Sequence, residues 1–146
     1  MSDFTVTLSD LVQISRDGHA FYSEAAGKVI DAEARQTIDD MAAVRANLIR
    51  DLSRQLKEHG EEPPRRGTLY GAMAKLYADT LATFSGDRDG VYVSQLEEAE
   101  DRLLHTFEEA LLSVDEPETR AILKRYLPLA RNAHARMSDL KHRKGN

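Results

Sequence analysis

The sequence contains no cysteine among its 146 residues. Disulfides, thiolate catalysis, zinc fingers and iron–sulfur clusters are therefore excluded. The sequence also lacks an apolar run long enough to cross a membrane, and its first ten residues, MSDFTVTLSD, do not have the pattern of a signal peptide. We therefore expect a cytoplasmic protein that has no membrane partner.

The chain has no excess of positive charge, since its 20 basic and 25 acidic residues give a net charge of −5. This balance argues against nucleic acid as a partner. The charges are unevenly distributed: residues 89–119 contain ten acids and one base, whereas residues 120–146 contain eight bases and one acid. Two adjacent helices of opposite charge would explain this pattern. The alternative is a basic helix that binds an anionic surface.

Apolar residues recur with a period close to 3.6 along almost the whole chain, which predicts a single all-α domain over residues 1–146. Gly18 lies within the apolar stripe of the first helix, where it indicates a close helix crossing, because glycine weakens a helix. Tyr22 and Tyr126 also lie on apolar stripes and are candidates to place hydroxyl groups inside. The predicted helices cover about residues 8–29, 32–59, 68–84, 91–114 and 116–143.

The lengths of the connections predict how these helices are arranged. Short turns join the first helix to the second and the fourth to the fifth, whereas about 30 residues separate the second helix from the fourth. A long crossover of this kind, here with an extra helix inside it, is typical of a ferritin-like four-helix bundle. An up-down bundle with the extra helix across one end is the alternative.

Four polar side chains fall on stripes that should face inward: Arg45, Glu97, Glu100 and His134. Buried charges are costly unless they are paired, and a buried guanidinium requires carboxylate partners. We therefore predict an internal network in which Arg45 pairs with Glu97 and Glu100. In this interpretation His134 is a hydrogen-bonded core residue, no residue is catalytic and no cofactor is needed.

A dinuclear metal centre is the functional alternative. Ferritin-like centres use one Glu from each of two helices and a Glu-x-x-His motif from each of the other two. No histidine in this chain has a glutamate three residues before it, so a complete centre is not expected. A reduced site for iron or another divalent metal is the remaining form, with Glu97, Glu100 and His134 as ligands and Glu24 as a further candidate.

The extra helix carries Tyr70, Met73 and Tyr77. Aromatic residues and methionine are enriched at protein interfaces, so these residues are candidates for a homodimer contact. Ordinary core packing is the alternative.

Several stretches taken together resemble one bacterial family: RDGHAFYSEAA, the arginine of VRANLIRDL, GEEPPRRGTLYGAM, EEAED and AHARM. The resemblance is to a ferritin-like four-helix family of unknown function with a degenerate metal-ligand set, and it covers almost the whole chain. It implies a ferritin-like bundle that forms a dimer and is linked to stress. Residues 44–47 and 131–134 stand where the wider superfamily has its Glu-x-x-His motifs, so the resemblance does not imply iron storage or diiron oxidation.

These observations lead to one functional prediction and one alternative. The prediction is a non-catalytic ferritin-like bundle, a stress-related structural or interaction protein, in which the Arg–Glu network replaces a dimetal site. The alternative is a metal-binding protein or oxidoreductase that uses the glutamates of residues 91–114 together with His134.

Overall fold

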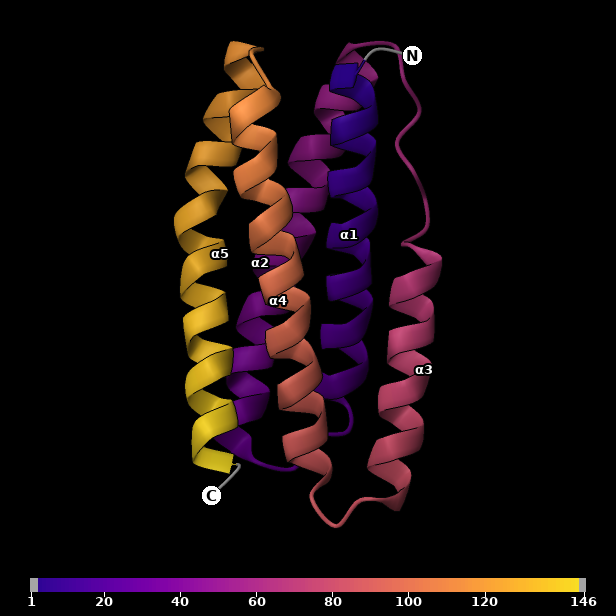
Figure 1. Cartoon of the computed structure of the whole chain (residues 1–146), viewed down its shortest axis with the longest axis vertical. Helices are drawn as coiled ribbons and strands as arrows, with labels where there is room; N and C mark the ends of the chain where they lie inside the picture. The colour runs from indigo at the N-terminus through magenta and orange to yellow at the C-terminus, as the bar shows by residue number, and fades with distance from the viewer. Residues whose placement is uncertain (1–2, 145–146) are drawn as a thin grey trace.

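The computed structural model describes residues 3–144, and in this part of the chain all regular structure is helical (Figure 1). None of these helices combines the length and the apolar character needed to span a membrane. The five helices are α1 (Asp3–Ala26), α2 (Ala32–Glu58), α3 (Leu69–Phe84), α4 (Arg88–Ser113) and α5 (Pro117–Lys144).

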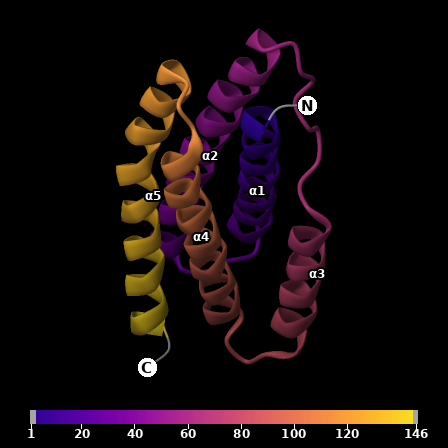
Figure 2. The same ribbon diagram turned by 45° about the horizontal axis from the view of Figure 1, so that its top comes forward.

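The four long helices form a bundle, and α3 lies outside it beside α1 and α4 (Figures 1 and 2). Around the bundle, α1 neighbours α2, α2 neighbours α5, α5 neighbours α4, and α4 neighbours α1. The segment between α2 and α4 returns along the length of the bundle, so α2 and α4 run in the same direction on opposite corners (Figure 1). The predicted all-α bundle with a helix-containing crossover is confirmed.

Helix α1 differs most from the sequence prediction. It begins at Asp3 and not near Leu8, and it ends at Ala26 and not near Val29. The earlier start adds a turn that brings Phe4 onto the apolar stripe, where its ring lies 4.6 Å from the ring of His59 at the end of α2. The other four helices begin and end within three residues of their predicted bounds.

The core consists of two apolar clusters, one in each half of the bundle. One contains Tyr22, Met41 and Leu96, the other contains Leu48 and Leu103, and all four long helices contribute buried residues to both. On α2 the residues between the two clusters include Arg45, and on α4 they include Glu100. A polar layer therefore divides the core at its middle.

The segment before α3 is fixed to α1 by polar contacts. Asp17 accepts hydrogen bonds from the backbone N–H (2.7 Å) and the hydroxyl (2.5 Å) of Thr68, the residue that caps α3. Arg16 donates a hydrogen bond from Nε to the carbonyl oxygen of Pro64 at 2.8 Å. A Cβ atom at Gly67 or Gly71 would collide with the Asp17 carboxylate, so glycine at both positions lets the segment approach α1 closely.

Candidate functional site: a buried Arg–Glu–Tyr cluster

An ion pair occupies the polar layer at the middle of the bundle. Arg45 of α2 is 3% exposed and Glu100 of α4 is 1% exposed. Nη2 of Arg45 donates directly to Oε1 of Glu100. Since α2 and α4 stand on opposite corners of the bundle, this contact crosses the core on its diagonal.

Tyr22 of α1 completes the cluster. Its hydroxyl donates to the same Glu100 oxygen at 2.5 Å, and its ring lies 5.6 Å from the guanidinium carbon of Arg45. This distance is within the range in which a cation is attracted to an aromatic face. One carboxylate oxygen thus accepts two hydrogen bonds, and three helices meet at a single buried ion pair.

Gly18 makes room for this cluster. A Cβ atom placed there would collide with Nη1 of Arg45, and the guanidinium therefore lies directly against the α1 backbone. The sequence predicted a close helix crossing at Gly18. In the structure the group that approaches is a side chain that reaches across from α2.

The cluster perturbs Tyr22 electrostatically. Burial, together with the neighbouring charge of Glu100, raises the pKa of Tyr22 well above its ordinary value of 10.0, although the charge of Arg45 opposes this. The phenol therefore stays protonated in the folded protein and continues to donate to Glu100.

One atom of each charged partner has no protein hydrogen-bond partner in the described part of the chain: Nη1 of Arg45 and Oε2 of Glu100. Both residues line a cavity of about 20 Å³. Ala130 and Ala133 of α5 form part of its wall, because their small side chains leave this space beside the ion pair. A cavity of this size accommodates about one water molecule.

The other two residues of the predicted network lie elsewhere. Glu97 is half-buried at the α4–α5 boundary, where its carboxylate contacts Nζ of Lys141 at 3.0 Å. Nε2 of His134 lies 3.6 Å from Glu97 and 3.6 Å from Asp101. The single network expected from the sequence is thus two separate groups, because Glu97 sits on the flank of α4 that faces α5, whereas Glu100 faces the core.

These contacts also bear on the uneven charge distribution. The acidic α4 and the basic α5 pack side by side, and Glu97 with Lys141 forms one of the ion pairs between them. This agrees with the interpretation of two adjacent helices of opposite charge.

Glu24, the additional metal-ligand candidate, lies in a third place. Its carboxylate is 2.7 Å from Nζ of Lys28 and 3.7 Å from Nζ of Lys75 on α3. The hydrogen bond from Lys28 lowers the pKa of Glu24. Glu24 therefore links α1 to α3 and does not approach Glu100 or His134.

Asp51 is a buried charge that the sequence prediction missed. This α2 residue is 5% exposed and accepts hydrogen bonds from Tyr126 at 2.7 Å and from Arg125 at 2.8 Å, both on α5. Tyr126 was expected to place its hydroxyl inside the bundle, and that hydroxyl donates to Asp51. The sequence signal for this contact was Tyr126 itself, because a tyrosine on an apolar stripe requires a hydrogen-bond partner for its buried hydroxyl.

The central residues do not fit a dinuclear metal centre. Such a centre requires several carboxylates and imidazoles that converge from four helices. Here Glu100 faces the guanidinium of Arg45, a permanent cation fixed to the opposite helix. Across residues 3–144, no group of three or more His, Asp or Glu side chains is placed to hold a metal ion.

Comparisons with known proteins identify the family. A family model described as "Domain of unknown function (DUF2383)" matches residues 3–113 of the 146, so the chain belongs to this family. No curated protein matches the chain. Membership agrees with the resemblance to a family without an agreed activity.

One solved structure, from Anabaena variabilis, is of a two-domain protein containing DJ-1/ThiJ/PfpI-like and ferritin-like domains. The match has a TM-score of 0.77 and 16% sequence identity, and it covers 99% of this chain and 37% of that chain. This chain thus spans just over a third of the length of that relative. The likeness confirms the ferritin-like fold that the connection lengths predict.

Replacing Arg45 with leucine should destabilise the protein by about 3–5 kcal/mol, because Glu100 would remain buried without its partner. Urea unfolding followed by circular dichroism measures this loss. Arg131→Leu is the matched control, since its side chain is exposed on α5 and the change should cost less than about 0.5 kcal/mol. Equal losses in the two variants would contradict the assignment.

Gly18→Ala provides a test whose sign is informative. Alanine has the higher helix propensity, which alone predicts that the free energy of unfolding rises by about 1 kcal/mol. The collision with Arg45 predicts a net loss of about 1–3 kcal/mol, as for other overpacked cores. When Gly18→Ala is combined with Arg45→Leu, the substitution of Gly18 should no longer lower the free energy of unfolding. If it still does, a group other than Arg45 fills the space beside Gly18.

Alkaline pH should destabilise the protein through Tyr22. Below pH 10 both states hold the phenolic proton. Above that pH the unfolded state loses the proton while the folded state keeps it, so the free energy of unfolding falls by up to about 1.4 kcal/mol per pH unit. Tyr22→Phe should reduce this slope by that amount in urea unfolding between pH 10 and 11. An unchanged slope would mean that Tyr22 ionises normally in the folded protein.

Proposed function

We propose that this protein is a non-catalytic ferritin-like module in which the cluster of Arg45, Glu100 and Tyr22 takes the place of a dimetal centre. The observation that carries the proposal is the direct contact between the Arg45 guanidinium and the Glu100 carboxylate at the middle of the bundle. In this role the protein acts through its surface, as a structural or interaction protein.

The chemistry of arginine supports this assignment. A carboxylate inside a helical bundle requires a positive partner, and in metal-containing bundles the ion supplies it. A guanidinium supplies the same charge but stays protonated in proteins and is part of the chain itself. Such a bundle can be complete as soon as it folds, with no dependence on metal supply.

The cluster also offers a structural role. Because it connects α2, α4 and α1 at one point, it favours the alignment in which these three residues lie at the same level. Buried polar groups are best attested as devices that fix register and partner choice among helices. We assign that role to this cluster.

The composition of the Anabaena relative supports a partner-directed role. Its ferritin-like domain occurs in one chain with a DJ-1/ThiJ/PfpI-like domain. A ferritin-like domain that stands beside a second, different domain in one chain is consistent with the proposal that this chain acts through its surface. A stress-related role stays a prediction.

Metal content tests the proposal. Protein purified without chelator should be exposed anaerobically to Fe(II), Mn(II) or Zn(II), desalted, and analysed by mass spectrometry. We expect retention far below one equivalent, and we expect no change in Glu100→Gln. Retention near one equivalent that is lost in Glu100→Gln would overturn the proposal.

The alternative metal site has its own variants in the same experiment. Near-stoichiometric retention that survives Glu100→Gln but is lost in Glu97→Gln and in His134→Ala would place a metal at the α4–α5 boundary. That outcome would support the metal-handling alternative and would overturn a role without metal.

A further inference from the structure

Helix α3 packs with its small side chains inward and its large apolar side chains outward. Gly71, Ala78 and Ala82 are buried against the bundle. Five large apolar residues lie on the opposite half of the helix and are 42–84% exposed: Met73, Leu76, Tyr77, Leu81 and Phe84. This is the reverse of an ordinary surface helix, whose large apolar side chains face the core. We call these five residues the α3 stripe.

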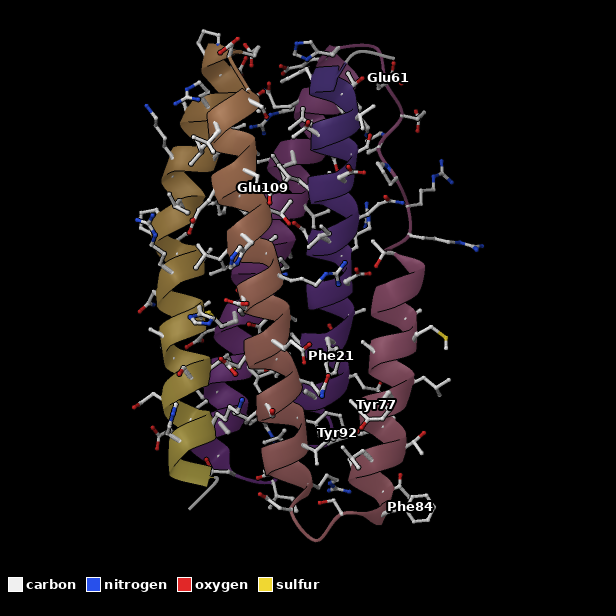
Figure 3. All side chains as sticks on the ribbon, viewed as in Figure 1. Phe21, Glu61, Tyr77, Phe84, Tyr92 and Glu109 are labelled. Atoms are coloured by element: carbon white, nitrogen blue, oxygen red, sulfur yellow. The ribbon has the colours of Figure 1, made fainter. Side chains whose placement is uncertain are left out.

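Figure 3 labels two members of the α3 stripe, Tyr77 and Phe84. Phe84, at the end of α3, points away from the four-helix bundle, whereas Tyr92 of α4 lies on the side of α3 that faces the bundle. Phe84 is the most exposed member of the stripe, at 84%. The sequence left open whether Met73 and Tyr77 are core or contact residues, and their exposure rules out core packing in this chain. The side chain of Tyr70 lies outside the described part.

The charged residues of α3 avoid the stripe. Lys75 turns toward α1, where its Nζ is 3.7 Å from Glu24. Asp79 turns toward α4 and accepts a hydrogen bond from Tyr92 at 2.8 Å. The exposed residues between Gly71 and Phe84 consequently carry no formal charge. Polar anchors thus hold α3 in an orientation that presents apolar surface to water.

The α3 stripe is large for an exposed apolar patch. Since a large side chain has roughly 150–250 Å² of surface, the exposed fractions of these five residues correspond to on the order of 500 Å². Contiguous apolar patches of this size on monomers are often functional. When two such patches meet they bury about 1,000 Å², which is the lower limit for a specific protein interface.

We propose that the α3 stripe binds the α3 stripe of a second copy of this chain, with the two helices antiparallel about a two-fold axis. An uncharged face can meet its own copy without bringing like charges together. A two-fold interface uses the same patch on both subunits, so each apolar side chain finds an apolar surface of equal length opposite it.

The charges at the two ends of α3 favour this orientation. Arg65 and Arg66 are exposed just before the start of α3, and Asp87 is exposed just after its end. In the antiparallel pair each arginine end lies beside the Asp87 end of the other copy, where the carbonyl end of the helix dipole also favours a cation. Arg88, also exposed at that end, offsets the charge of Asp87, so the helix dipole carries this attraction. A parallel pair would place the arginine ends together.

Sedimentation velocity measures the assembly directly. The parent protein should sediment with twice the 16.4 kDa mass of one chain. Leu76→Glu places a charge in the stripe and should raise the dimer dissociation constant at least about tenfold. Leu112→Glu is the matched control, because Leu112 is 89% exposed on α4 and outside the stripe, and this variant should remain dimeric.

Two results of that experiment would overturn the proposal. If the parent protein sediments as a monomer throughout a wide concentration range, the stripe does not bind its own copy and serves a different partner. A dimer that Leu76→Glu does not weaken would use another face. Circular dichroism of each variant confirms that the fold is retained.

Cysteine cross-linking tests the orientation, and the absence of native cysteine makes it unambiguous. Thr80 lies near the middle of the stripe, so Thr80→Cys should form a disulfide with its own copy. Met73 lies at one end, about 16 Å along the axis from Phe84. Met73→Cys should therefore not cross-link to itself, but it should cross-link when mixed with Phe84→Cys. Self-cross-linking of Met73→Cys would indicate a parallel pair and would contradict the proposal.

Discussion

The structure depends on how the bundle compensates one desolvated carboxylate, that of Glu100. Removing an ionised carboxylate from water costs several kcal/mol, and the interior must return that energy through contacts of good geometry. Arg45 supplies opposite charge, Tyr22 supplies a hydroxyl donor, and Gly18 supplies the space that the guanidinium occupies. The choice of residue at each of these positions follows from the presence of the charge.

The same interaction fixes how the helices of the bundle are aligned along their axes. The two apolar clusters on either side of the polar layer contain leucine, valine, alanine and aromatic side chains, and burial of such side chains is non-directional. A single ion pair on the diagonal penalises any alignment that separates its partners. Apolar packing therefore supplies most of the stability, and the ion pair selects the arrangement.

Much of this could be predicted from the sequence, because helical periodicity and loop length report directly on fold. Arg45 and Glu100 stood out for the same reason, as charges on apolar stripes. The stripe position of Glu97 was ambiguous, since it follows the buried Leu96 directly and lies on the flank of α4. The burial of Asp51 was not recognised for the same reason, because Asp51 directly precedes the buried Leu52. A period of 3.6 gives the face of a residue only to within a fraction of a turn.

The orientation of α3 could not be read from its pattern. Both halves of this helix are largely apolar, one with glycine and alanine and the other with large side chains, and burial of the large side chains is the usual outcome. Contacts remote in sequence decide otherwise: Asp17 with Thr68, Glu24 with Lys75, and Asp79 with Tyr92.

The central claim is that Arg45 and Glu100 stabilise the fold as a pair and not as two independent residues. A double-mutant cycle of Arg45→Leu, Glu100→Leu and the combined variant, followed by urea unfolding, measures their coupling free energy. The account predicts a coupling of about 2 kcal/mol or more, with the double variant more stable than Arg45→Leu alone. Losses that add to within about 0.5 kcal/mol would contradict it, because independent residues show no coupling.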